Sequence, residues 1–221
     1  MMTRSFPILA ASFLIAAPAS AGFLVGNTDA MIVGAGYIDL EDPSWENLAD
    51  AALIENPPVG SFISVASGIP GVETFLSYLR FDGLSGNTAV FVFENIAQAA
   101  PFSPGSPYEA AFAGNRLTIT SSIDFVITLQ GTLLGTGAGR GGFNLIGSGE
   151  SPVIFDPAAG PVLYSRTISA GTRTFGWSAL VGPLGGTADF VGTMTVTFIP
   201  APAAVSLLAI TGFVGGRRRR R

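Results

Sequence analysis

Apolar and polar residues alternate along two long segments of the chain. Between Leu117 and Leu129 most odd-numbered positions are apolar, and most even-numbered positions carry Thr, Ser or Asp. The segment from Ala188 to Phe198 alternates in a similar way, with Thr and Asp at most of the polar positions. Successive side chains of a β-strand point to opposite faces, so this period of two predicts strands with one buried face. The second segment predicts a long final strand that runs directly into Pro200.

The remaining strand candidates are short. Ala89 to Phe93 is a continuous apolar run and predicts a strand buried on both faces. Six other segments have strand-like composition: Met31 to Leu40, Ser61 to Ser67, Phe75 to Phe81, Gly142 to Ile146, Val162 to Ile168 and Thr174 to Val181. The chain holds 29 Gly and 15 Pro, many of them between these segments. Short strands with such turns predict an all-β fold, an antiparallel β-sandwich or jelly roll.

One short helix is also expected, at the end of the sandwich. Asp42 is a good helix-capping residue, and Pro43 suits the first helical position. A helix beginning there gathers five apolar residues on one face: Trp45, Leu48, Ala49, Ala52 and Leu53. The prolines that follow Asn56 would end it.

The first 21 residues have the features of a secretory signal peptide. Arg4 precedes an apolar stretch, and Ala19 and Ala21 form an A-x-A cleavage site. Cleavage after Ala21 leaves residues 22–199 as the predicted exported domain. A buried N-terminal helix or strand is the alternative interpretation.

The last 22 residues, 200–221, have the features of an anchoring tail. Pro200, Ala201 and Pro202 precede an uncharged apolar run from Ala203 to Gly216. A helix from Ala201 to Gly216 would be about 24 Å long at 1.5 Å per residue, close to the roughly 30 Å of a bilayer core. Five arginines then follow, Arg217, Arg218, Arg219, Arg220 and Arg221, and would stop translocation on the cytoplasmic side. The tail therefore predicts a C-terminal transmembrane helix, either cut after sorting or kept as a permanent anchor.

Together the two ends resemble the PEP-CTERM class of exported bacterial proteins. The resemblance rests on Pro200-Ala201-Pro202, the apolar run and the arginine cluster, with Ala201 where the motif usually has glutamate. It implies processing near Pro200 by an exosortase-type enzyme. It also implies delivery to the cell envelope or extracellular surface, with an exopolysaccharide matrix as a partner.

Charge and composition exclude several classes of function. Residues 22–199 hold five arginines and all 15 acidic residues, so their net charge is −10 and binding to nucleic acid is disfavoured. The chain has no His, Cys or Lys, which removes Ser-His-Asp and Cys-His nucleophiles, Schiff bases, phosphate-loop lysines and His or Cys metal ligands. Without cysteine there are no disulfides. A carboxylate pair, as in a glycosidase, is the remaining route to catalysis.

The glycine-rich segment from Gly137 to Gly142 fits the spacing G-x-G-x-x-G of dinucleotide-binding proteins. That fingerprint requires a helix to follow, whereas the next residues, Phe143 to Ile146, are strand-like. We therefore interpret the segment as a flexible hairpin loop.

Two weak candidate sites remain. Asp39, Glu41 and Asp42 are oxygen ligands of the kind calcium prefers, although their spacing is not that of an EF-hand. Five aromatic residues have side chains suited to stacking on sugar rings: Trp45, Tyr78, Tyr108, Tyr164 and Trp177. Trp45 and Tyr108 are the preferred glycan candidates because they lie in or beside loops, whereas Trp177 alternates with Phe175 and Ala179 and is expected in the core.

The sequence thus predicts an exported, membrane-associated surface or matrix protein without catalytic activity. A carbohydrate-binding module, with or without calcium, is the alternative, and a carboxylate-dependent glycosidase is the third hypothesis. No other cofactor is expected.

Overall fold

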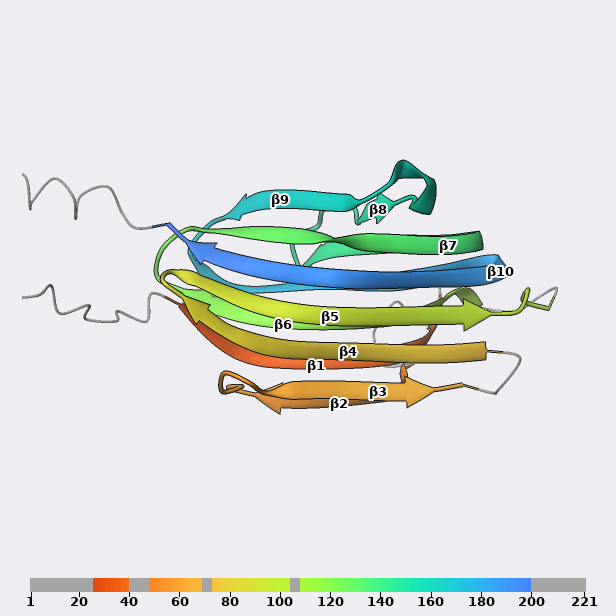
Figure 1. The fold of residues 1–221 in the computed structure, drawn as a ribbon, viewed down its shortest axis with the longest axis horizontal. Coiled ribbons are helices and arrows are strands. Elements are labelled where there is room, and N and C mark those ends of the chain that lie inside the picture. Colours follow the sequence, from red (N-terminus) through yellow and green to blue (C-terminus); the bar gives the residue numbers. More distant parts are fainter. Residues whose placement is uncertain (1–25, 40–47, 69–72, 104–107, 200–221) are drawn as a thin grey trace, which may run out of the picture.

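The computed structural model describes residues 26–39, 48–68, 73–103 and 108–199 of the 221-residue chain. They form ten strands of one antiparallel sheet (Figure 1). The strands are β1 (Gly26–Asp39), β2 (Leu48–Glu55), β3 (Phe62–Ser67), β4 (Glu73–Ser85), β5 (Thr88–Ala99), β6 (Tyr108–Ser121), β7 (Phe125–Ile146), β8 (Val153–Phe155), β9 (Val162–Ile168) and β10 (Gly171–Phe198). The predicted all-β antiparallel fold is confirmed.

The sheet is folded so that its two halves pack face to face, because β7 and β10 run through both halves. The first layer contains β2, β1, β6, residues 171–181 of β10, residues 139–146 of β7, and β8. The second layer contains β3, β4, β5, residues 186–198 of β10, residues 125–137 of β7, and β9. In Figure 1, β4 and β5 overlie β1 and β6. The predicted sandwich is therefore two layers of one continuous sheet.

The glycine-rich segment lies where β7 bends between the layers. It is part of the strand rather than the predicted hairpin loop, and strand-like Phe143 to Ile146 follows it as expected. A Cβ atom on Gly139 would lie 1.9 Å from the carbonyl oxygen of Thr187 in β10. Gly137 has φ +61°, a backbone conformation that other residues rarely adopt. The glycines serve the close approach of two bent strands and not a bound phosphate.

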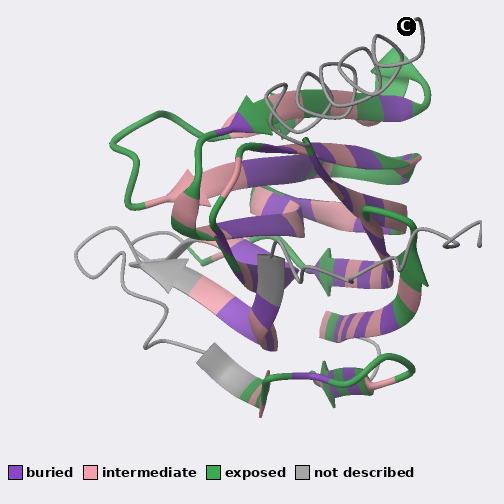
Figure 2. Ribbon diagram, turned by 90° about the vertical axis from the view of Figure 1, so that its left-hand side faces the viewer, coloured by how far each residue is buried: buried purple, intermediate pink, exposed green. Residues whose placement is uncertain are grey.

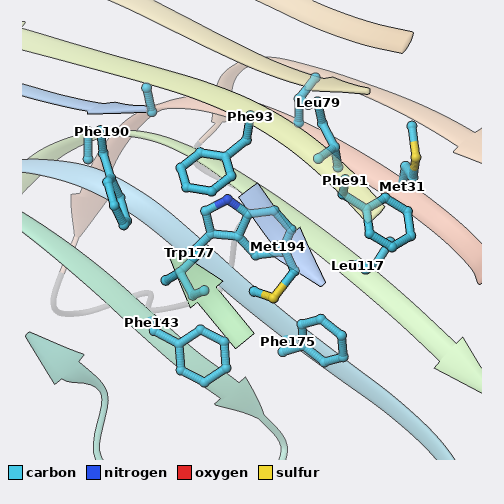
Figure 3. Packing of buried hydrophobic residues seen from close by; sticks show 14 of the residues in the cluster. Met31, Leu79, Phe91, Phe93, Leu117, Phe143, Phe175, Trp177, Phe190 and Met194 are labelled. Carbon is cyan, nitrogen blue, oxygen red and sulfur yellow. The ribbon is translucent and has the colours of Figure 1, made fainter. Parts of the chain in front are cut away.

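The space between the layers is filled by apolar side chains. Figure 2 shows buried and partly exposed positions alternating along the strands, as a sheet with one buried face requires. Trp177 is 1% exposed, which confirms its expected place in the core. Its ring meets Phe93 of the opposite layer in a T-shaped arrangement, with ring centres 5.5 Å apart (Figure 3). Phe93 in turn packs edge-on against Phe190, so aromatic contacts cross the core.

Three polar side chains interrupt this apolar core. Ser77, Asn95 and Asn115 are all fully buried. The Ser77 hydroxyl oxygen lies 3.0 Å from Asn95 Oδ1, 2.9 Å from Asn115 Oδ1 and 2.8 Å from the Gly114 carbonyl oxygen. Ser77 and Asn95 belong to the second layer, whereas Gly114 and Asn115 belong to the first. The cluster therefore connects the layers through polar contacts at the centre of the molecule.

Two further local predictions are wrong, besides the predicted hairpin loop. Residues 48–53, expected in the second half of a helix, form strand β2 and pair with β1. The apolar residues Leu48, Ala49, Ala52 and Leu53 fit either structure, and pairing with a neighbouring strand overrides the helical pattern. Ala89 to Phe93 is buried on one face only, because Val90 and Val92 on the other face are partly exposed. Among the described residues the only helix is a short 3₁₀ turn, η2 (Pro157–Ala159).

Both ends of the folded region lie at the same end of the molecule (Figure 1). Gly26 pairs with Ser121, and Phe198 pairs with Phe125 four residues further along the chain. The amide of Ile199 donates to the Asp124 carbonyl oxygen at 2.9 Å, so the chain is held at this end up to residue 199. No helix in residues 26–39, 48–68, 73–103 or 108–199 is long and apolar enough to cross a membrane. The predicted signal peptide (1–21) and tail (200–221) lie outside the described residues.

Candidate functional site

The outer face of the second layer presents two neighbouring rows of side chains that cross the strands. Strand register aligns the first row as Phe62, Arg80, Val92, Thr193, Gln130 and Leu163. The second row is Ser64, Tyr78, Glu94, Val191 and Thr132. These eleven residues are called the cross-strand band. With strands about 4.8 Å apart, the five steps from β3 to β9 span roughly 24 Å.

An exposed aromatic pair lies at the β3 end of the band. Phe62 is 64% exposed, although large apolar residues are usually buried in strands. Its ring stacks with that of Tyr78 on β4, with centres 6.4 Å apart and an interplanar angle of 29°. Ile63 and Val65, the inward-facing neighbours of Phe62 on β3, are buried, so the position of Phe62 follows from the alternation of the strand. The pair offers a flat apolar surface to solvent.

The charged groups beside this pair are partly neutralised. Arg80 Nε lies 2.6 Å from Asp82 Oδ1, and Asp82 is the extra residue at a bulge between β4 and β5. The close carboxylate of Asp82 raises the pKa of Arg80. Glu94, next to Tyr78 in the second row, adds a negative charge to the band.

A shallow groove lies at the other end of the band, on β10, β7 and β9. Its volume is about 550 Å³, and the backbones of Gly131 and Gly192 form part of its lining. The other lining residues are Gln130, Thr132, Pro161, Val162, Leu163, Val191 and Thr193. One amide and two hydroxyl side chains can therefore hydrogen-bond a ligand here, while Leu163 and Val191, 72% and 42% exposed, supply apolar contacts.

Asp189 lies on the same outer face, two residues before Val191 of the groove on β10. It is aligned with Ile96 of β5 and Leu134 of β7, so apolar side chains flank it on both sides. Burial against these neighbours raises the pKa of the Asp189 carboxyl. Its Oδ1 atom has no hydrogen-bond partner among the described residues. The face therefore combines hydroxyl, amide, aromatic and apolar groups with few charges.

The structure places only part of the candidates predicted from the sequence. Asp39 and Tyr108 pair in register where β1 ends and β6 begins, which brings one calcium candidate beside one glycan candidate. Glu41, Asp42 and Trp45 lie outside the described residues, as do Ala19, Ala21, Pro200, Ala201, Pro202 and Arg217 to Arg221. Within the described part of the chain, no three His, Cys, Asp or Glu residues are grouped so that they could hold a metal ion. The calcium site stays a prediction.

Tyr78 is among the aromatic candidates predicted from the sequence, whereas Phe62 and the groove residues are not. One signal was present for Phe62: it is an aromatic residue on the face of β3 that otherwise carries Ser64 and Ala66. The groove residues gave no such signal, because Gln130, Leu163 and Thr193 are brought together only by the pairing of three strands.

Comparison with known proteins gives little further information. No protein-family model matches the chain, and no curated protein matches it. Solved structures show a distant likeness, and three of them have a TM-score of 0.28 each. TmCBM61 in complex with β-1,4-galactotriose is 8% identical, and the match covers 55% of this chain and 88% of that one. The others are isomalto-dextranase of Arthrobacter globiformis T6 with panose and β-glucosidase of Kluyveromyces marxianus with glucose.

The match to the isomalto-dextranase has 13% identity and covers 74% of this chain. The match to the β-glucosidase has 12% identity and covers 77% of this chain. The chain spans only 30% and 17% of the lengths of these two proteins. Likeness at this level carries no argument about function.

Proposed function

We propose that this chain is an exported, non-catalytic surface protein that binds an extracellular glycan on its cross-strand band. The observation that carries the proposal is the exposed, stacked pair of Phe62 and Tyr78, aligned in register with the groove at Gln130 and Thr193. Sugars present both apolar C–H faces and hydroxyl groups. A binding face for them needs flat aromatic surface together with hydrogen-bonding side chains, and the band has both.

Binding of this kind requires no catalytic group. A sugar ring that packs on Phe62 removes apolar surface from water, which is worth about 25 cal/mol per Å². Gln130, Thr132 and Thr193 are positioned to exchange hydrogen bonds with sugar hydroxyls that enter the groove. All eleven residues of the band lie on strands, and its rows follow the strand register. Binding therefore involves little loss of backbone entropy.

The proposed location follows from the predicted terminal segments. β10 ends at Phe198, and only Ile199 separates it from the Pro200-Ala201-Pro202 segment of the predicted tail. A tail that leaves from this end would hold the strands by one end and leave the outer faces of the layers accessible. The receiving partner would be the exopolysaccharide matrix, after action of an exosortase-type enzyme or, with a permanent anchor, at the membrane.

The mass of the protein recovered from its producing cells tests this location. Loss of residues 1–21 and of Arg217 to Arg221 supports sorting with cleavage. A mature chain that keeps the five arginines and sediments with membranes supports a permanent anchor. A chain that keeps residues 1–21 and stays inside the cell contradicts export. A control chain truncated after Ile199 is expected in the medium with the same N-terminus.

Glycan binding is tested with the purified mature protein and a panel of insoluble polysaccharides, measured by depletion from solution. Phe62→Ala and Tyr78→Ala are each expected to reduce binding at least about tenfold, in line with the loss of a central aromatic contact. Ile154→Ala is the matched control, because Ile154 is 56% exposed on β8 in the other layer. The proposal is rejected if neither Phe62→Ala nor Tyr78→Ala reduces binding, or if the protein binds no polysaccharide. Repeating the measurement with EDTA tests the calcium-assisted form.

A rigid matrix protein without a glycan ligand is the second candidate. The polar cluster that links the layers and the low charge of the outer face fit such a role equally well. The Phe62→Ala variant distinguishes the two candidates. It should reduce glycan binding if the first is correct, and it should leave a purely structural role unchanged. No described residue favours the glycosidase hypothesis over these two, and it stays a prediction.

A further inference from the structure

We propose that the band binds one uncharged, extended glycan chain that lies across the strands and occupies two subsites at once. The first subsite is the aromatic pair of Phe62 and Tyr78, and the second is the groove around Gln130 and Thr193. The proposal rests on the glycan-binding function and specifies the chemistry, direction and length of the ligand.

The direction follows from strand register. Phe62, Thr193 and Gln130 belong to one row, although they come from β3, β10 and β7. From β3 to β7 the row crosses four strand spacings, or about 19 Å. A ligand that lies along a strand reaches only one subsite. A ligand that lies across the strands passes from the aromatic pair over Arg80 and Val92 into the groove.

The absence of charge on the ligand follows from the charges of the face. Arg80, the one positively charged residue of the band, forms an ion pair with Asp82, so the two together add no net charge to the face. Glu94 and Asp189 add two negative charges on the same face, and the described structure gives neither of them a salt bridge. A uronic-acid or sulfated chain is repelled there, whereas a neutral chain is not.

The length requirement follows from the separation of the subsites. Each subsite alone contacts one or two sugars, so each is expected to bind weakly. A chain long enough to reach both converts the second contact into an intramolecular event, which raises the affinity without any new type of contact. Affinity should therefore rise steeply with chain length and then level off once both subsites are filled.

Calorimetric titration of the full mature protein with oligosaccharide series provides the test. The probes are neutral cello-, xylo- and β-1,4-galacto-oligosaccharides from disaccharide to octasaccharide, with oligogalacturonides as the anionic series. For at least one neutral series the octasaccharide is expected to bind at least about 30-fold more tightly than the disaccharide. The oligogalacturonides are expected to bind at least about tenfold more weakly than neutral chains of equal length.

Variants at each subsite separate this proposal from general glycan binding. Phe62→Ala and Gln130→Ala should each remove the length dependence while leaving the weak affinity for short chains at the other subsite. Ile154→Ala should behave as wild type. The melting temperatures of all variants report folding, and Phe62→Ala should fold normally because the side chain is 64% exposed.

Three outcomes overturn the proposal. Glycan binding that is independent of chain length, or is lost in neither subsite variant, rejects the two-subsite arrangement but leaves the proposed function standing. Tighter binding of the anionic series rejects the uncharged ligand. No binding of any glycan, together with a dimer in sedimentation that Phe62→Ala dissociates, rejects both proposals and assigns the face to contact between copies.

Discussion

The Ser77 hydroxyl oxygen on β4 lies 2.9 Å from Asn115 Oδ1 on β6, in the other layer. Both residues are fully buried, and the same hydroxyl also lies within hydrogen-bonding distance of Asn95 and the Gly114 carbonyl oxygen. A serine hydroxyl carries a single proton, so it can donate to only one of these three acceptors at a time. The Nδ2 atoms of Asn95 and Asn115 have no hydrogen-bond partner among the described residues. The relative position of the layers is thus fixed by polar contacts as well as by apolar packing.

Ser77→Ala is expected to lower the free energy of unfolding by about 1–3 kcal/mol, because it leaves buried polar groups without a partner. Urea denaturation followed by circular dichroism measures the change. Ser85→Ala, at the exposed end of the same strand, is the matched control and should change stability by less than about 0.5 kcal/mol. Equal stability of the two variants would show that the cluster contributes nothing.

Gly139→Ala is expected to destabilise the protein by more than about 3 kcal/mol or prevent folding, because backbone atoms rather than flexible side chains occupy the space. The added Cβ would lie 1.9 Å from the Thr187 carbonyl oxygen at the bend of β7 against β10. Gly149→Ala is the control. Its φ is +72° but no atom lies within 4 Å, so only the backbone strain of about 1–2 kcal/mol remains. Thermal unfolding measures the stability of both variants. A Gly149→Ala variant that is less stable than Gly139→Ala would contradict the close-approach argument.

Alternation, together with short segments of strand-like composition, was sufficient to predict most of the strands. Val162 to Ile168 is β9 with the predicted bounds, and Trp177 lies in the core as expected. The path of β7 and β10 through both layers was not predictable in this way. A glycine-rich segment has the same composition whether it forms a sharp bend within a strand or a loop. The Thr187 carbonyl, whose closeness requires glycine at position 139, is also distant from Gly139 in sequence.

The cross-strand band could not be predicted from the sequence for a similar reason. Candidates such as Trp45 and Tyr108 were selected because they lie near loops, a local property of the sequence. The band instead depends on register, since Phe62 and Gln130 are 68 positions apart in sequence and meet in one row through four strand pairings. A shift of one residue in any pairing would turn one of these side chains to the opposite face.

Trp177→Ala is expected to cost about 3–5 kcal/mol of stability, because a large aromatic side chain is removed from contact with Phe93 and Phe175. Trp177→Phe keeps much of this contact and should cost less than half as much. Chemical denaturation gives the comparison, with Leu184→Ala as a control because Leu184 is 82% exposed. Similar losses in Trp177→Ala and Leu184→Ala would contradict the packing described for this core.

Asp189→Asn is expected to raise the melting temperature at neutral pH. Burial raises the pKa of Asp189 above that of an unfolded aspartate, so the folded state binds the proton more tightly. Stability from this group is present below the unfolded pKa and is lost as the pH rises through the folded pKa. Asparagine carries no charge at any pH and avoids that loss. The side chain is only partly buried, so the gain should be about 1–2 °C.

The pH dependence of this gain separates burial from a general effect of charge. Scanning calorimetry at several pH values should show the gain shrinking to zero in acid, where Asp189 is protonated in both folded and unfolded protein. Glu73→Gln, which removes one negative charge from β4, is the control for reduced net charge. If Glu73→Gln gave the same gain with the same pH profile, the increase would reflect net charge, and desolvation of Asp189 against Ile96 and Leu134 would not be its cause.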